Sequence, residues 1–276
     1  MSDVAILGAG PIGAAVAHKL AERERVRAVR LIDPAGTVAA GKALDIAQSG
    51  PVDGFDTRVT GATDVLAAVG AGVIVIADGV AEGEWSGEAG LAMLRQIVRA
   101  GTTAPFVFAG PSQISLLERC FQELKVPADR LIATAASSFV SSVRALAGIE
   151  INQAAAEVAA AGRPPELVVA WSCATAAGAL LTERIAAHRL AAIARAARGL
   201  WPPGPQAIAA PTSLVVEALL EGSRQLHPAV TILDGELGIR GRAGLLSLEL
   251  GRRRVLARHL PSLSPLEKVE AGRGFD

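Results

Sequence analysis

Short apolar runs alternate with segments of helical periodicity over the first 110 residues of the chain. Five of the runs are predicted to be β-strands: 4–7, 28–32, 58–60, 72–77 and 105–109. The run at 72–77 is apolar throughout after its initial glycine, and it has no polar face. Such a run is typical of a strand in a parallel sheet that helices cover on both sides.

The segments between these runs are predicted to be helices. In 11–24 apolar residues recur every four positions, which places them on one helical face. Further helices are predicted at 42–47, after an N-cap at Asp64, and at 87–101. Repeated strand–helix units with right-handed crossovers build an open, doubly wound sheet. The first half of the chain is therefore predicted to be an α/β domain.

The second half is less regular. Its predicted helices and strands are helices at 140–146, 178–198 and 212–220, and strands at 229–233 and 244–250. Residues 151–161 are ambiguous between helix and strand, and the proline-rich segment 200–205 ends the long helix before it. We predict two domains, with the parallel sheet in 1–143 and a mixed α/β lobe in 144–276.

Charge and composition restrict the class of function. Lys+Arg and Asp+Glu both total 27, so nothing draws the whole molecule toward nucleic acid or an anionic membrane. No apolar run reaches the roughly 20 residues of a membrane span. The two cysteines, Cys120 and Cys173, form no CxxC pattern, and the four histidines form no HExxH pattern. We expect a cytoplasmic protein that contains no metal site.

One glycine-rich turn carries the strongest functional signal. Residues 8–13 read Gly-Ala-Gly-Pro-Ile-Gly, directly after the first predicted strand and at the start of the first helix. In such a turn the first glycine permits the bend, the second lets the backbone approach a pyrophosphate, and the third lets helix and strand pack closely. Helix N-termini favour phosphates. The predicted cofactor-binding residues of the turn are Gly8, Gly10, Pro11, Ile12 and Gly13.

Asp33 ends the second predicted strand, twenty residues after Gly13. A carboxylate there accepts the ribose hydroxyls of an adenosine and repels a 2′-phosphate, so we predict NAD rather than NADP. The alternative is a ligand-free turn in which the aspartate only caps nearby backbone. Ala77 and Gly79 are also predicted to contact the cofactor. Asp78, between them, would oppose NAD if it faced the pyrophosphate and assist if it faced a ribose.

From these residues onward the chain resembles the malate/lactate dehydrogenase superfamily, nearly end to end. Beyond the glycine turn and Asp33, the resemblance rests on residues 41–45, 51–55, 59–61, 210–211, 215–218, 233–239 and 263–268. The resemblance implies a Rossmann-type doubly wound parallel sheet followed by a mixed α/β lobe. It also implies a nicotinamide dinucleotide as cofactor and a homodimer or homotetramer as the assembly.

The family's chemistry requires residues that this chain lacks. A histidine takes the hydroxyl proton, an aspartate orients it, one arginine clamps the substrate carboxylate, and a second arginine lies on a mobile loop. The histidine's segment resembles 159–165, which has none, and the aspartate and clamp positions are Phe139 and Ser142. The loop 80–88 carries three glutamates instead of arginine, and Gly110 replaces an asparagine. We predict no catalytic residue of the family type.

Three functions remain open. The first, which we favour, is an NAD-binding pseudoenzyme that lacks family hydride transfer. The second is an active NAD-dependent oxidoreductase that acts on the CH–OH group of a neutral or cationic substrate. Its candidate site residues are Glu82, Glu84, Glu88, Ser142, Arg144 and Arg163. The third is a structural subunit that dimerises and keeps only a vestigial nucleotide site. The sequence therefore leaves open whether the chain is an enzyme.

Overall fold

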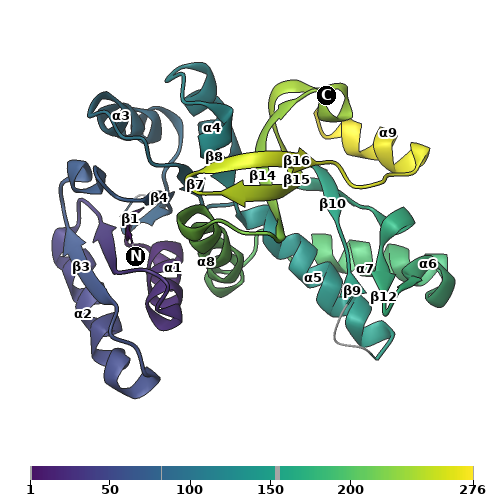
Figure 1. The fold of residues 1–276 in the computed structure, drawn as a ribbon, viewed down its shortest axis with the longest axis horizontal. Coiled ribbons are helices and arrows are strands. Elements are labelled where there is room, and N and C mark those ends of the chain that lie inside the picture. Colours follow the sequence, from purple (N-terminus) through teal and green to yellow (C-terminus); the bar gives the residue numbers. More distant parts are fainter. Residues whose placement is uncertain (1, 82, 153–155, 276) are drawn as a thin grey trace.

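The structure is a computed structural model that describes residues 2–81, 83–152 and 156–275. Its central feature is a set of six parallel strands: β1 (Asp3–Leu7), β2 (Ala28–Ile32), β3 (Arg58–Ala62), β4 (Val73–Ile76), β7 (Phe106–Phe108) and β8 (Leu131–Ala133). These lie in the order β3-β2-β1-β4-β7-β8 (Figure 1). The strand succession reverses between β1 and β4, and sheets of this type bind ligands at the carboxyl ends of the strands there.

Alternate residues of the strands face two separate hydrophobic cores. In β4, Ile74 and Ile76 belong to one core, and Val73 and Val75 belong to the other. All four are fully buried, as the apolar pattern predicts. The helices that contribute to these cores include α1 (Pro11–Arg23), α2 (Gly36–Asp53), α3 (Gly87–Arg99), α4 (Ile114–Gln122), α5 (Ala135–Glu150) and α8 (Pro205–Glu221). Helices α3 and α4 cover one side, and α1, α2 and α8 cover the other (Figure 1).

The sheet continues into the second half of the chain through antiparallel strands. These strands are β14 (Leu226–Asp234), β15 (Arg240–Gly251), β16 (Arg254–His259), β10 (Ala160–Arg163) and β11 (Glu166–Val169). Strand β14 pairs with β8, and β15 joins β14, β10 and β16, which gives an eleven-stranded sheet. The predicted fold class, a mixed α/β fold built on a doubly wound parallel sheet, is confirmed.

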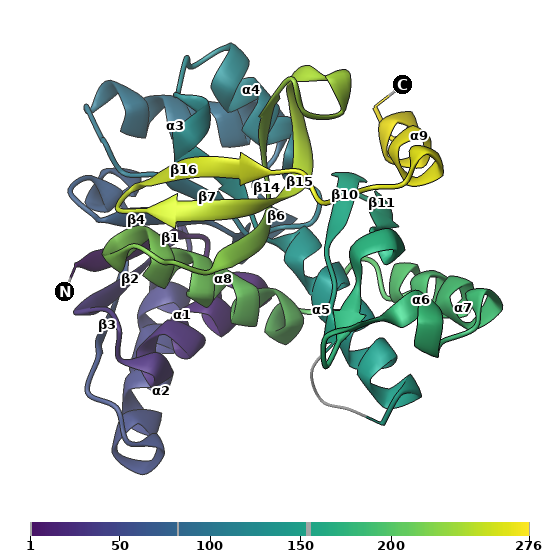
Figure 2. The same ribbon diagram turned by 45° about the vertical axis from the view of Figure 1, so that its right-hand side comes forward.

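A small lobe lies on the side of α5 away from α8 (Figure 2). It contains the remaining short elements: β9 (Ala156–Glu157), β12 (Thr175–Ala176), β13 (Ala179–Leu180), α6 (Leu181–Arg184) and α7 (Ala187–Arg198). The last helix is α9 (Pro265–Arg273), and a capping box of Ser264 and Glu267 lies at its N-terminus. The predicted domain boundary at 143/144 falls inside α5, which is continuous there. The division into two domains stays a prediction.

Several predicted helices differ from those in the structure. The single helix at 178–198 is wrong: Gly178 has a left-handed φ of +79°, and residues 179–180 form β13, which pairs with β12. Helix then forms in two pieces, α6 and α7. The helix after Asp64 is a short 3₁₀ turn (Val65–Ala68).

Two predicted helices are longer in the structure than their sequence signals indicated. The helix predicted at 42–47 is α2, which continues past Pro51, and the helix predicted at 212–220 is α8, which begins at Pro205 and passes through Pro211. Pro211 disfavours helix in the turn that precedes it. That turn still forms at the start of α8 because Ile208 and Ala209 are fully buried, and their packing stabilises it.

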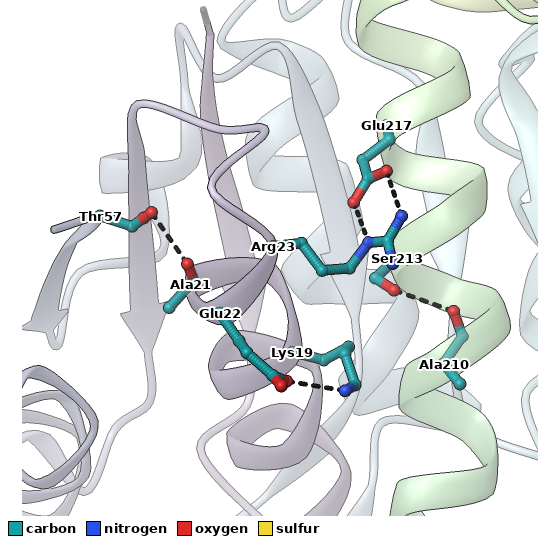
Figure 3. Close-up of polar contacts among 8 residues, drawn as sticks. All are labelled: Lys19, Ala21, Glu22, Arg23, Thr57, Ala210, Ser213 and Glu217. Atoms are coloured by element: carbon teal, nitrogen blue, oxygen red, sulfur yellow. Dashed lines mark hydrogen bonds and ion pairs between the residues drawn. The ribbon is translucent and has the colours of Figure 1, made fainter. Parts of the chain in front are cut away.

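Helix α1 packs against α8, and one ion pair between them joins the two halves of the chain (Figure 3). The Arg23 guanidinium forms a two-pronged ion pair with Glu217, and its Nη2 lies 2.9 Å from Oε2. Thr57 Oγ1 donates to the carbonyl of Ala21 at 3.1 Å, which ties the start of β3 to the end of α1. The half of the chain that contains the glycine turn therefore packs directly against the second half.

The two cysteines differ in accessibility, and both are free thiols. Cys120 is fully buried in α4, and burial raises its pKa to about 12. Cys173 is partly exposed, with a pKa that burial also raises.

Because only the thiolate reacts, iodoacetamide at pH 8 is expected to modify Cys173 more than about ten-fold faster than Cys120. Peptide mass spectrometry measures the two rates. Equal rates in the native protein, rather than only in denaturant, would contradict the burial of Cys120.

Candidate functional site

The glycine turn lies at the carboxyl end of β1, where the doubly wound order reverses. Gly8 has a φ of +114°, a left-handed conformation that favours glycine. A Cβ on Gly13 would lie 2.1 Å from the carbonyl oxygen of Gly8, so the third glycine lets α1 start directly against the turn. The first and third glycines thus have the structural roles that the motif predicts.

The carboxylate of Asp78 occupies the N-terminus of α1. Its Oδ1 accepts a hydrogen bond from the Gly13 amide at 2.9 Å, and its Oδ2 accepts one from the Ile12 amide at 3.2 Å. The side chain is 7% exposed. The aspartate therefore faces the position that a pyrophosphate takes in this type of turn, where the helix dipole and free amides favour an anion.

No amide of residues 8–13 remains for an outside ligand in this conformation. Gly8 donates to Ile32 O at 2.7 Å and Gly10 to Asp78 O at 2.8 Å, while Pro11 has no amide hydrogen. A Cβ on Gly10 would lie 2.4 Å from the Asp78 carboxyl carbon. The close approach that the second glycine offers a pyrophosphate is thus used by Asp78.

Asp33 lies where the sequence predicted, at the end of β2, but its carboxylate binds backbone. Its Oδ2 accepts from the amides of Ala9 at 2.9 Å and Val80 at 3.0 Å, and its Oδ1 accepts from Ala35 at 2.9 Å. The residue is 2% exposed. Lys42 Nζ donates to the carbonyl of Ala9 at 2.6 Å, directly beside this cluster. In this conformation the carboxylate of Asp33, which was predicted to bind a ribose, is buried.

Asp78 begins a two-stranded hairpin, β5 (Asp78–Gly79) and β6 (Gly83–Glu84), in which Asp78 pairs with Glu84. We call β5 and β6 the carboxylate hairpin. The Glu84 Oε2 accepts from the amide and the hydroxyl of Ser112, at 2.9 and 2.7 Å, just before α4. A Cβ on Gly110 would lie 2.1 Å from this oxygen, so only glycine leaves room for the carboxylate. The hairpin therefore reaches from the start of α1 to the start of α4.

Gln113 is a site residue that the sequence reasoning missed. It is fully buried, its Nε2 donates to Ala77 O at 2.7 Å, and its Oε1 accepts from the Gly110 amide at 2.9 Å. It ties the end of β4 to the turn before α4. The predicted cofactor residues Ala77 and Gly79 are both buried at this junction. The only sequence signal for Gln113 was its position two residues after the Gly110-Pro111 turn.

A cavity of about 340 Å³ lies beside the end of β2. It is lined by Leu7, Ile32, Pro34, Thr63, Asp64, Val65, Trp85, Met93 and Gln96. The Trp85 Nε1 atom is buried and has no hydrogen-bond partner among the described residues. The tryptophan that immediately follows the carboxylate hairpin therefore forms part of the wall of a cavity at the end of β2.

The positions that resemble the family's catalytic set have other roles here. Phe139 is 5% exposed in the hydrophobic core, and Ser142 is half-buried on α5. Arg163, in the segment without histidine, pairs with Glu118, and its Nη2 lies 3.0 Å from Oε2. Glu118 also accepts from the Ala243 amide at 2.8 Å. Burial alone would raise the pKa of Glu118, but these hydrogen bonds hold the pKa below its ordinary value.

The candidates for a rebuilt active site are dispersed. Glu88 pairs with Arg119 at 2.6 Å, and the Arg144 guanidinium donates to Val158 O at 3.1 Å. Burial lowers the pKa of Arg144. Glu82 lies outside the described residues. Among the others, no described hydrogen bond or ion pair joins any two of them.

None of the histidines is a residue of α5 or β10. His18 Nε2 is 3.8 Å from Asp53, His259 Nε2 is 3.7 Å from Glu249, and His188 is an exposed residue of α7. His227 Nε2 lies 3.0 Å from Ser223 Oγ, and burial lowers its pKa. Among residues 2–81, 83–152 and 156–275, no three His, Cys, Asp or Glu side chains are grouped to hold a metal ion. None of the helices in those ranges has the length and apolar character of a membrane span.

The strand order, the glycine turn and Asp33 together define a doubly wound dinucleotide-binding protein with an appended mixed lobe. The sequence model described as lactate/malate dehydrogenase, NAD binding domain, matches residues 2–95. A malate dehydrogenase of Staphylococcus carnosus is 30% identical over 262 residues, which cover 87% of this chain and 84% of that protein. The chain belongs to the lactate/malate dehydrogenase family, as the sequence resemblance predicted. The matched domain supports a nicotinamide dinucleotide as the class of cofactor.

Solved structures share the whole fold. A minor L-lactate dehydrogenase of Enterococcus mundtii superimposes with a TM-score of 0.88 at 19% identity, over 99% of this chain and 95% of the other. A malate dehydrogenase of Salinibacter ruber gives 0.85 at 22% identity, over 99% and 94%. At these identities the likeness concerns the fold alone.

Proposed function

We propose that this protein is an NAD-binding member of the family that does not carry out hydride transfer between NAD and a 2-hydroxy acid. The observation that carries the proposal is the replacement of the catalytic set. The position that resembles the orienting aspartate is Phe139 in the core, the clamp position is Ser142, and Arg163 in the histidine segment is paired with Glu118.

Each replacement removes a step of the chemistry. Without an imidazole, the hydroxyl proton has no acceptor when hydride leaves. Without a guanidinium, the substrate carboxylate has no two-pronged partner. Asp78 and Glu84, on the paired strands of the carboxylate hairpin, bring negative charge to the starts of α1 and α4, and this charge disfavours an anionic 2-keto acid nearby.

The dinucleotide part of the proposal rests on the glycine turn and on Asp33. Both lie at adjacent strand ends, at the switch point where doubly wound sheets bind nucleotides. A carboxylate at the end of β2 favours NAD over NADP because it repels a 2′-phosphate. We also propose the homodimer or homotetramer that the family resemblance implies.

Assays of NADH formation with malate and lactate test the loss of catalysis. We expect kcat/KM to be at least about 10⁴-fold below that of an active malate dehydrogenase measured in parallel, because several catalytic groups are lost together. Calorimetric titration with NAD and NADH, repeated with Asp33→Ala, tests the binding. Turnover within about a hundred-fold of the control enzyme would refute the proposal.

A second candidate function is favoured by one observation: the Staphylococcus carnosus relative, at 30% identity, is named malate dehydrogenase. An active oxidoreductase with a rebuilt site would act on a neutral or cationic alcohol or amine. A substrate panel that shows NADH formation would establish this function in place of the first. A sizing experiment that shows an oligomer, with no NAD binding by calorimetry, would instead support a structural subunit.

A further inference from the structure

The conformation described above does not fit a bound dinucleotide. A pyrophosphate in the glycine turn needs the amides of Ile12 and Gly13, and both donate to the Asp78 carboxylate. A ribose at Asp33 needs its carboxylate oxygens, which accept from Ala9, Ala35 and Val80 amides. The amides and the carboxylate that a dinucleotide would use are therefore hydrogen-bonded to other groups of the chain.

Two of these groups, the Asp78 carboxylate and the Val80 amide, come from one segment, while the Ala9 and Ala35 amides come from the glycine turn and from the residue before α2. Asp78 supplies the anion at α1, and the next residues, 79–80, place a backbone amide on Asp33. Glu84 supplies a second anion beside α4, and Trp85, which follows it, lines the cavity together with Ile32 and Pro34. A phosphate-like anion, a hydrogen-bond donor to Asp33 and an aromatic ring correspond in chemical kind to the diphosphate, ribose and adenine of an adenosine diphosphate.

We infer that the carboxylate hairpin is an internal competitor of the dinucleotide: it occupies the crevice by imitating the diphosphate with Asp78, and a nicotinamide dinucleotide binds only when the hairpin leaves. The inference rests on the proposed function, because it presumes that a dinucleotide binds. Its physical basis is that two anions compete for one set of amides. A pyrophosphate and the Asp78 carboxylate cannot both lie at the start of α1 without strong repulsion.

Competition makes a quantitative demand. When the binding-competent state is only a fraction of the molecules, the apparent Kd is raised by the inverse of that fraction. Residues Ala77-Asp78-Gly79 resemble the family's strand-end motif, which has alanine at the middle position. The substitution Asp78→Ala therefore removes the competing anion and adds no new group. We expect the variant to bind NADH about ten-fold or more tightly than the unaltered protein.

The first arm of the test needs no ligand. The first amides of a helix lack intrahelical acceptors, so slow hydrogen exchange at Ile12 and Gly13 reports directly on Asp78. We expect both amides to be protected in the unaltered protein and to exchange at least about ten-fold faster in Asp78→Ala, as measured by NMR. Glu267→Ala is the matched control, since it also removes a carboxylate from backbone amides, at α9, and leaves this turn untouched.

The second arm titrates the same proteins with NADH, by calorimetry and by Trp fluorescence. Tighter binding by Asp78→Ala, with Glu267→Ala unchanged, supports the competition. Equal affinity of Asp78→Ala and the unaltered protein, both binding, overturns the inference and leaves the proposed function standing. No NADH binding by either protein overturns both. Rapid exchange at residues 12 and 13 in the unaltered protein overturns the inference whatever the affinities.

A second variant keeps the test valid if Asp78→Ala folds poorly. Val80→Pro deletes the amide that donates to Asp33 and leaves both carboxylates in place. It removes one of the two hydrogen bonds that Asp33 Oδ2 accepts, the other being from the Ala9 amide, so a ribose hydroxyl can take its place and NADH is again expected to bind more tightly than to the unaltered protein. Unchanged or weaker binding by folded Val80→Pro would count against the hairpin as a competitor.

Discussion

Gly13→Ala lowers the free energy of unfolding by about 3 kcal/mol, as expected for a methyl group forced into packed backbone. The added Cβ would lie 2.1 Å from the carbonyl oxygen of Gly8 and 3.4 Å from the Ala77 side chain. The nearest atom belongs to the backbone, so it cannot move away as a flexible side chain would. Relief requires α1 to shift from β1, which separates parts of a buried core. Urea unfolding followed by far-UV circular dichroism measures the loss.

Gly41→Ala is the matched control for this prediction. Gly41 lies in α2, and a Cβ there meets no described atom within 4 Å. Alanine has the higher helix propensity, so this variant is expected to be as stable as the unaltered protein or more stable by about 0.5–1 kcal/mol. A Gly13→Ala protein with an unchanged urea midpoint would show that α1 is not held against the turn as described.

Glu118→Gln is expected to destabilise the protein by about 3 kcal/mol at pH 7, because it leaves the guanidinium of a largely buried pair without its counter-charge. The side chains of Arg163 and Glu118 are 16% and 12% exposed, and Arg242 lies 3.4 Å from the same carboxylate. The group connects α4, β10 and β15. Chemical unfolding of both proteins across pH 3.5–7 measures the difference.

The pH dependence follows from the lowered pKa of Glu118. Burial opposes ionisation, but the hydrogen bonds from Arg163 and Ala243 outweigh it, so the folded pKa lies below the ordinary 4.5. The stabilisation is therefore complete above 4.5 and is lost as the pH falls through the folded value. The two proteins are expected to approach equal stability in acid. The exposed pair of Glu123 with Arg119 provides the control: Glu123→Gln is expected to cost less than about 0.5 kcal/mol.

Local patterns specified the parallel core of the fold. The predicted strands at 4–7, 28–32 and 105–109 agree with β1, β2 and β7 to within one residue at each end. The runs at 4–7 and 105–109 are apolar at every position, because burial on both faces excludes polar residues, whereas 28–32 has one arginine at a partly buried position. The glycine turn and Asp33 were located for the same reason: each directly follows one of these runs.

Distant pairing decided the elements that the patterns missed. Strands β8 and β10 have three and four residues, and neither was predicted as a strand from the sequence. Each exists because a partner strand lies beside it: β7 and β14 beside β8, and β11 and β15 beside β10. The predicted helix at 178–198 failed for a related reason, since residues 179–180 pair with β12.

Local sequence patterns were enough to show that a glycine turn and a carboxylate end neighbouring strands and that the chain has the family's fold. The direction of the Asp78 side chain is set by tertiary contacts. A residue just past a strand end can face either side of the crevice, and its direction here depends on amides 65 and 66 residues away in sequence and on the Glu84–Ser112 contact. Such long-range hydrogen bonds leave no periodic trace in a sequence, because they depend on how separate elements meet in space.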